Sequence, residues 1–243
     1  MNTSIYQNIA TRTAGDIYIG VVGPVRTGKS TFIKRFMETQ VIPNIDNVYR
    51  KERARDELPQ SGSGRTIMTA EPKFVPEEAA QIQLPDGASF SVRLIDCVGY
   101  MIDGAAGHME EDAERMVKTP WSEEEIPFTQ AAEIGTDKVM RDHSTIGLVI
   151  TTDGSIGELP RSNYLGAEEK TILALKKSGK PFLVLVNSQK PYSEETRQVA
   201  EEIGKKYDVA VMPVNCEQLK KEDINRLLEK ILYEFPLTAV EFY

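Results

Sequence analysis

The chain has 243 residues, of which 40% are hydrophobic and 27% are charged. This composition suits one large folded domain or two small ones, and it excludes a chain that is mostly disordered. Acidic residues outnumber basic residues, 37 against 29, and the net charge of -8 repels a phosphate polymer at long range. We therefore expect no nucleic-acid partner.

The cysteine and histidine content argues against a disulfide-rich protein and against a cysteine–histidine metal site. Cys97 and Cys216 are too few for a disulfide framework, which is typical of a reducing compartment. His108 and His143 do not lie near the cysteines at metal-ligand spacing. The N-terminal residues do not resemble a secretory signal, and no apolar run reaches the ~18 residues that cross a bilayer. These features predict a cytoplasmic protein without a membrane span.

The first elements predicted along the chain are a strand and a helix. Residues 17–23 (IYIGVVG) are β-branched and closed by glycine, as in a strand buried on both faces of a parallel sheet. The helix begins near Lys29 and is interrupted at Pro43. Its apolar residues share one face: Phe32, Ile33, Phe36 and Met37. Residues 47–57 are nearly all charged and predict a solvent-exposed helix, which the flexible sequence SGSG at 61–64 follows.

An antiparallel hairpin is predicted next. Apolar and polar residues alternate on both sides of the turn sequence Pro85-Asp86-Gly87, and the second strand ends at Asp96. The alternating apolar residues are Ile82, Leu84, Phe90, Val92 and Leu94. Residues 100–144 have weak periodicity, and we assign no element there.

The last part of the chain has the spacing of βαβ units. Apolar strands are predicted at residues 147–151, 181–187 and 209–215. Helical patterns cover residues 164–178, 193–206 and 221–233. The predicted fold is therefore α/β, with three layers and a mostly parallel sheet that contains one antiparallel hairpin.

A phosphate-binding motif lies between the first strand and the first helix. Residues 23–30 (GPVRTGKS) match G-x-x-x-x-G-K-[ST], and both flanks disfavour the alternative of a glycine-rich turn that binds nothing. The glycines let the main chain curl so that its N–H groups point inward, Lys29 reaches the β- and γ-phosphates, and Ser30 binds Mg²⁺. The predicted phosphate-binding residues are Gly23, Pro24, Val25, Arg26, Thr27, Gly28, Lys29, Ser30 and Thr31. The fold prediction thus becomes a P-loop NTPase.

A second motif completes the predicted magnesium site. Asp96-Cys97-Val98-Gly99 has the D-x-x-G pattern, in which the carboxylate orders Mg²⁺ and the Gly99 amide meets the γ-phosphate. A plain strand-ending turn uses the same residues, so the motif counts only together with the phosphate loop. Thr66 and Thr69 are both candidates for a threonine that senses the γ-phosphate. We favour Thr69, because the extended Glu71-Pro72 follows it. The predicted metal ligands are Ser30, Thr69 and Asp96.

The residues after the strand at 181–187 favour adenine over guanine. Guanine is normally read by the aspartate of N/T-K-x-D, but here the sequence is Asn187-Ser188-Gln189-Lys190. Lysine cannot accept a hydrogen bond, and losing such a contact removes discrimination of ~10⁴ or more. Asn187 is predicted to orient a base, to brace the phosphate loop or to cap the strand end. We include Asn187 and Ser188 among the nucleotide-binding candidates.

The catalytic prediction centres on Arg26. The residue after D-x-x-G is Tyr100 rather than the glutamine that orients water in many such hydrolases, so we expect slow turnover. Arg26 lies inside the phosphate loop, and large GTPases of the guanylate-binding group have a similar R-T-G-K-S. That likeness implies an arginine finger supplied in cis, worth ~10³ to 10⁵ in rate; the alternative is a solvent-facing arginine. The predicted catalytic residues are Lys29, Arg26, Asp96 and Thr69.

Longer blocks of sequence resemble the stage IV sporulation protein A family, the spore-coat morphogenetic ATPases of endospore-forming bacteria. These blocks are GDIYIGVVGPVRTGKSTFIKRFME, DELPQSGSGRTIMTAEPKFVP, RLIDCVGY, AAEIGTDKV, HSTIGLVITTDGSIGE and LYEFP. The resemblance covers essentially the whole chain. It implies a TRAFAC/GTPase-like P-loop domain with ATP and Mg²⁺ as cofactors, in which Lys29, Asp96 and Thr69 correspond to the phosphate-loop lysine, the Mg²⁺-ordering aspartate and the sensor threonine. The second threonine that many members carry is Ala70 here.

The resemblance also implies a biological role. Mg²⁺-dependent binding and slow hydrolysis of ATP would drive self-assembly of a spore-coat basement layer at the forespore surface, in the mother-cell cytoplasm. Residues 1–236 are predicted to form the ATPase domain, and residues 237–243 to begin a missing C-terminal region. That region is implied to contact a small amphipathic membrane-anchoring peptide and other coat proteins. We therefore expect weak or no filament formation by this chain.

Two other functions remain open from the sequence. One is a GTPase switch that recruits a partner and reads guanine through groups that the motifs do not identify. The other is a structural module that binds nucleotide without hydrolysing it. Competition between ATP and GTP for the site distinguishes a GTPase switch from an ATPase. Measurement of phosphate release distinguishes a module that only binds nucleotide from an ATPase.

Overall fold

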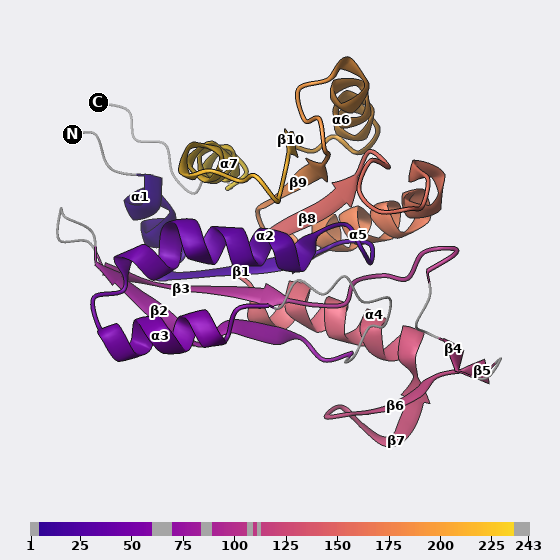
Figure 1. The fold of residues 1–243 in the computed structure, drawn as a ribbon, viewed down its shortest axis with the longest axis horizontal. Helices are drawn as coiled ribbons and strands as arrows, with labels where there is room; N and C mark the ends of the chain where they lie inside the picture. Colours follow the sequence, from indigo (N-terminus) through magenta and orange to yellow (C-terminus); the bar gives the residue numbers. More distant parts are fainter. Residues whose placement is uncertain (1–4, 60–69, 84–88, 106–108, 111–112, 236–243) are drawn as a thin grey trace.

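The computed structural model describes residues 5–59, 70–83, 89–105, 109–110 and 113–235. A six-stranded sheet in the order β10-β9-β8-β1-β3-β2 forms its centre (Figure 1). The strands are β1 (Asp16–Val22), β2 (Lys73–Gln83), β3 (Ser89–Asp96), β8 (Ile146–Thr152), β9 (Phe182–Asn187) and β10 (Val211–Val214). All neighbours in the sheet are parallel except β2 and β3, which form an antiparallel pair. The predicted α/β fold with a mostly parallel sheet and one antiparallel pair is confirmed.

Helices cover both faces of this sheet, so the fold has three layers (Figure 1). One core lies between the sheet and the helices α1 (Ile5–Arg12), α2 (Lys29–Phe36), α3 (Val48–Asp56) and α7 (Lys221–Tyr233). The other core lies between the opposite face and the helices α5 (Leu165–Ser178) and α6 (Glu194–Tyr207). All residues of β8 and β9 are buried, which explains why their sequences are apolar runs rather than alternating patterns.

Most elements predicted from periodicity are present. The strand predicted at 17–23 is β1, and the helix predicted at 221–233 is α7 with those bounds. The charged helix predicted at 47–57 is α3, whose N-cap Asn47 accepts a hydrogen bond from the Arg50 amide at 3.0 Å. The hairpin is also present, with Ile82 opposite Phe90. Its predicted turn and the SGSG sequence lie outside the described residues.

The structure adds elements where the sequence pattern was weak. Helix α1 was not predicted, and residues 100–144 contain the short pair β4 (Met109–Glu110) and β5 (Ala113–Glu114), the hairpin β6 (Met116–Thr119) and β7 (Ser122–Pro127), and α4 (Phe128–Lys138). The strands β5, β6 and β7 are largely exposed, so they lack the apolar alternation by which a half-buried strand is recognised. Helix α2 is also shorter than predicted: it continues as a π-helix (Met37–Val41) and a 3₁₀ turn (Ile42–Asn44).

Strand β1 marks the point where the order of the sheet reverses. Its two neighbours are β3 on one side and β8 on the other, and all three strands run in the same direction. In open α/β sheets, ligands bind at the carboxyl ends of the strands beside such a reversal. The loop that follows β1, residues 23–28, begins at this point, and the ends of β3, β8 and β9 lie at the same edge.

The packing of α5 predicts a large difference between two leucines of this helix. Leu175 is fully buried against the sheet, whereas Leu173 is 51% exposed. We expect Leu175→Ala to lower the free energy of unfolding by about 2 to 5 kcal/mol, because it removes buried apolar surface and leaves a cavity. Leu173→Ala, the matched control, changes it by less than about 1 kcal/mol. Urea unfolding followed by circular dichroism measures both values, and equal losses would contradict the packing.

Candidate functional site

The loop between β1 and α2 is curled in a way that requires glycine. Gly23 and Gly28 have φ angles of 137° and 94°. A Cβ at Gly23 would lie 2.3 Å from the carbonyl oxygen of Ile150, and one at Gly28 would lie 2.4 Å from Nδ2 of Asn187. Arg26 has a φ of 62° and is exposed. The pattern of glycines in the sequence thus reflects both the backbone conformation and the close approach of β8 and β9.

Lys29 brings a buried positive charge to this loop. The residue is 6% exposed, and its Nζ donates to the carbonyl oxygens of Pro24 at 2.6 Å and Gly23 at 3.5 Å. Burial lowers the pKa of Lys29, while the negative charge of Asp96 acts in the opposite direction. Within the described residues, no carboxylate lies within ion-pair distance of Nζ. The loop therefore holds an ammonium group whose charge an anion would balance.

Ser30 and Asp96 meet beside the lysine. The Ser30 hydroxyl donates to Oδ2 of Asp96 at 2.6 Å, although the two residues are far apart in the sequence. Burial raises the pKa of Asp96, and the hydrogen bond from Ser30 acts against it. The other oxygen, Oδ1, is buried and has no hydrogen-bond partner among the described residues. An orphaned carboxylate oxygen beside a serine hydroxyl suits a hard cation such as Mg²⁺, which prefers oxygen ligands.

The segment after Asp96 is interlocked with the loop. The Val25 amide donates to the carbonyl oxygen of Tyr100 at 3.0 Å, and the Tyr100 amide donates to that of Gly23 at 3.2 Å. Gly99 has a φ of 92°, and a Cβ there would lie 2.0 Å from the Gly23 carbonyl oxygen and 2.8 Å from Nζ of Lys29. The two motifs can approach each other this closely only because residue 99 is a glycine, which has no side chain.

Tyr100 uses its side chain for packing against α4. It is 3% exposed, and its hydroxyl donates to Oδ1 of Asp137 at 2.6 Å. Burial raises the pKa of this hydroxyl, and the hydrogen bond to Asp137 adds to the effect. The tyrosine that stands after D-x-x-G is therefore held by another part of the structure.

Asn187 contacts the phosphate loop in the manner of a brace. Its Nδ2 donates to the carbonyl oxygen of Thr27 at 2.9 Å, and its Oδ1 accepts from the Cys216 amide at 3.0 Å. Of the three roles that the sequence left open, these contacts match bracing. Ser188 is fully buried and pairs with the Thr196 hydroxyl at 3.1 Å, and Lys190 is exposed.

The structure thus brings together most of the residues that the sequence singled out. Residues 23–31, Asp96, Gly99 and Asn187 surround one end of β1. Thr66 and Thr69 lie outside the described residues, so both remain sequence-based candidates for the sensor and for the third metal ligand.

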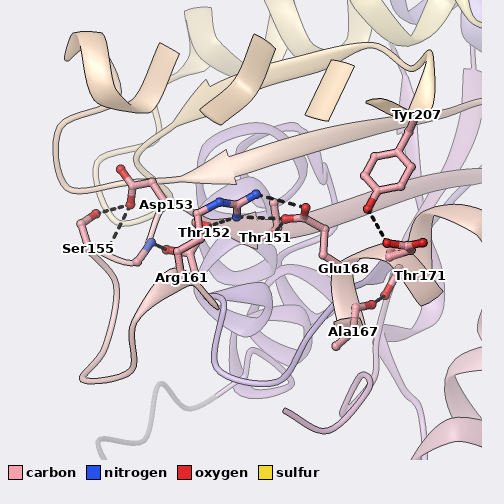
Figure 2. A network of polar contacts seen from close by, with 11 residues as sticks. Thr151, Thr152, Asp153, Ser155, Arg161, Ala167, Glu168, Thr171 and Tyr207 are labelled. Atoms are coloured by element: carbon pink, nitrogen blue, oxygen red, sulfur yellow. Dashed lines mark hydrogen bonds and ion pairs between the residues drawn. The ribbon is translucent and has the colours of Figure 1, made fainter. Parts of the chain in front are cut away.

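Sequence reasoning missed a buried polar network beside the site (Figure 2). Glu168, which is 1% exposed, accepts from Arg161 through both oxygens, with Nη1–Oε2 and Nη2–Oε1 distances of 3.0 and 3.1 Å. The Thr151 hydroxyl donates to the same carboxylate at 2.5 Å. The helical spacing of the sequence could have indicated that Glu168 is buried. Glu168 lies on the same face of α5 as Thr171, Ile172 and Leu175, which are all fully buried.

Comparison with known proteins gives the family. The family model described as stage IV sporulation protein A, ATPase domain, matches residues 1–236. The chain belongs to this family. It is 55% identical over 240 residues to stage IV sporulation protein A of Clostridioides difficile (strain 630), covering 99% of this chain and 49% of that protein. The proteins of the same name from Bacillus anthracis and Bacillus subtilis (strain 168) are both 54% identical over 236 residues, covering 97% of this chain and 48% of each relative.

The sporulation family predicted from the sequence blocks is therefore confirmed, and the chain spans about half the length of the curated relatives that it matches. The family name also supports the prediction of an ATPase domain. Over the part of the chain that the structure describes, no helix is both long enough and apolar enough to cross a bilayer.

The contact at Gly99 predicts a severe effect of one methyl group. Gly99 and Gly15 both have a φ of 92°, but a Cβ at Gly15 would have no atom within 4 Å. Gly15→Ala therefore reports backbone strain alone, which costs about 1 to 3 kcal/mol. Gly99→Ala adds a collision with the Gly23 carbonyl and Lys29, so we expect a clearly greater loss in the free energy of unfolding. Chemical denaturation of the two variants measures the difference, and equal losses would show that the contact is not close.

The environment of Cys97 predicts a thiol that reacts slowly in the folded chain. Burial raises its pKa from near 9 to about 11. Roughly one thiol in a thousand is then ionised at pH 8, and we expect iodoacetamide to label folded Cys97 slowly, at rates that rise about tenfold per pH unit. The thiol ionises at a lower pH in the unfolded chain than in the folded chain. A rise in pH from about 9 to 11 therefore favours the unfolded chain and lowers the free energy of unfolding. Mass spectrometry measures labelling with and without urea, and rapid labelling of the folded chain at pH 8 would contradict this prediction.

Proposed function

We propose that this chain is a P-loop, TRAFAC/GTPase-like domain that binds ATP with Mg²⁺ and hydrolyses it slowly. One observation carries the proposal: the Lys29 ammonium is buried in a curled glycine loop at the reversal point of the sheet, next to the Ser30–Asp96 pair. The name of the family, an ATPase domain, agrees with it.

The loop would bind the phosphates through its main chain and Lys29. The main-chain N–H groups at the N-terminus of α2 favour negative charge, and the lysine adds a full positive charge. Asp96 lies at the end of β3, on one side of β1, and β8 and β9 lie on the other. This arrangement supports a bound triphosphate whose terminal phosphate faces β3 and whose nucleoside extends over the ends of β8 and β9.

Ser30 and Asp96 would hold the magnesium ion, which neutralises phosphate charge when bound. The orphaned Oδ1 of Asp96 supports this role, because a buried acceptor without a partner costs about 1 to 3 kcal/mol. Thr69 remains the candidate for a further ligand, with Thr66 as the alternative.

Arg26 is the residue that we propose to stabilise the transition state. It projects from the phosphate loop with an exposed side chain and a positive φ. The Tyr100 hydroxyl is already bonded to Asp137, which supports slow turnover because a well-placed water-orienting group is missing at that position. Lys190, an exposed cation where a guanine-reading carboxylate would stand, supports adenine as the base.

The biological part of the proposal concerns the longer protein. The relatives are named for stage IV of sporulation, and we propose that ATP turnover drives self-assembly of a coat basement layer on the forespore surface, in the mother-cell cytoplasm. Contacts with a small amphipathic anchoring peptide and with other coat proteins would involve a C-terminal region that follows the ATPase domain of residues 1–236.

Titration and phosphate release with four proteins test the enzymatic proposal. For the unaltered chain, we expect calorimetry with Mg²⁺ to give tighter binding of ATP than of GTP. Lys29→Ala should abolish measurable binding, because the buried charge that meets the phosphates is lost. Arg26→Ala should retain binding and lower the rate of phosphate release by ~10³ or more. Arg35→Ala, which alters an exposed arginine of α2 that forms an ion pair with Glu38 at 3.5 Å, is the control and should change neither value.

Each proposed feature has its own contradicting result. GTP binding as tight as ATP binding would reject adenine selectivity. Phosphate release that neither Lys29→Ala nor Arg26→Ala changes would reject hydrolysis at this site and leave a nucleotide-binding module. If neither nucleotide produced heat, the nucleotide site itself would be rejected.

A further inference from the structure

The segment between β8 and α5, residues 153–164, shares a core with the phosphate loop and contacts the stretch that follows Gly99. Tyr164 is 1% exposed and packs in the same core as Val25 of the phosphate loop. Asn163 donates through Nδ2 to the carbonyl oxygen of Asp103 at 2.8 Å, and a Cβ at Gly104 would lie 3.3 Å from Leu159. The segment therefore connects the phosphate loop with the stretch that follows Gly99.

Charged groups fix this segment near both of its ends (Figure 2). At its start, the Asp153 carboxylate accepts from the hydroxyls of Ser155 at 2.6 Å and Thr196 at 2.7 Å. Towards its end, Arg161 forms the two-bond ion pair with Glu168 and also donates to the carbonyl oxygen of Thr152 at 2.6 Å. Bidentate pairs of this kind fix geometry as well as adding energy.

The segment also lies within electrostatic reach of Arg26. Burial raises the pKa of the Tyr164 hydroxyl, and the positive charge of Arg26 acts in the opposite direction. Gly157 approaches the same hydroxyl, since a Cβ there would lie 3.7 Å from it. Tyr164 thus lies close to Gly157 of its own segment and shares a core with Val25 of the phosphate loop.

We propose that Glu168 and Arg161 are positioning residues for hydrolysis: their largely buried ion pair holds residues 153–164 so that Tyr164, which shares a core with Val25, keeps the neighbouring Arg26 in the place from which it acts. This inference rests on the proposed function of Arg26. Neither Glu168 nor Arg161 touches the nucleotide in this scheme, and both act through the arginine of the phosphate loop.

A purely structural ion pair would behave differently. It would lower the free energy of unfolding without a specific effect on the catalytic rate of the folded molecules. The chain offers a matched control one residue away: Glu169 pairs with Lys206 at 2.8 Å on the exposed side of α5, with side-chain exposures of 46% and 58%. Glu169→Gln removes an ion pair from the same helix by the same chemical change as Glu168→Gln.

A double-mutant cycle with Arg26 tests the inference. ATP hydrolysis at saturating nucleotide and the Kd for ATP are measured for Glu168→Gln, Arg161→Lys and Glu169→Gln, each with Arg26 intact and with Arg26→Ala. With Arg26 intact, we expect Glu168→Gln and Arg161→Lys to lower the turnover rate by roughly tenfold to a hundredfold, as small misplacements do, and to change the Kd by less than about twofold. Glu169→Gln should change neither. In the Arg26→Ala background, Glu168→Gln should cause no further loss of rate.

Several results would overturn the inference. It is rejected if Glu168→Gln lowers the rate equally in both backgrounds, if the Kd weakens in parallel with the rate, or if the rate is unchanged. Should Glu168→Gln fail to fold, Thr151→Val is measured in the same way, because it removes only the hydroxyl bonded to Glu168 and keeps the side-chain shape. Normal hydrolysis by Arg26→Ala would reject both the role of Arg26 and this inference, whereas a chain that never hydrolyses ATP would reject the proposed function itself.

Discussion

The close contact between the loop after β1 and the end of β3 underlies the whole site. Gly99 approaches Gly23 so closely that no side chain fits between them, and the exchange of main-chain hydrogen bonds with Tyr100 holds the two segments together. Lys29 is enclosed by this contact, bonded to carbonyl oxygens of its own loop. A buried ammonium is costly unless it is compensated, and here two carbonyl oxygens accept its hydrogen bonds while the negative charge of Asp96 lies nearby.

Lys29 and Asp96 together suit a ligand that carries both signs of charge. The positive charge of Lys29 favours an anion, while the orphaned oxygen of Asp96 favours a cation. A phosphate chain with its divalent metal ion satisfies both at once, which is why the proposal joins ATP to Mg²⁺ rather than to either alone. Desolvation strengthens each of these interactions because the local dielectric constant is low.

The sheet supplies the rigidity on which these contacts depend. Strands β8 and β9 are buried on both faces, so the loops at their carboxyl ends have fixed starting points. Asn187 at the end of β9 bonds the phosphate loop directly, and Glu168 on α5 ties the segment after β8 to the sheet through Arg161 and Thr151. The match to the ATPase-domain family covers residues 1–236, which include the whole sheet and the loops at its edge.

Elements and motifs with local signals could be predicted from the amino-acid sequence. The glycine loop between β1 and α2, the aspartate at the end of β3, the antiparallel pair and helix α7 were all predicted, because contiguous spacing and apolar periodicity specify them. The folded structure was needed to show that Asn187 meets Thr27 across 160 positions of sequence and that Glu168 pairs with Arg161. It also decided the exposed hairpin β6–β7, whose polar strands carry no periodic signal. The physical reason is the same in each case: hydrogen bonds and ion pairs between distant residues depend on which strand ends the folded sheet brings together, and no local pattern encodes that.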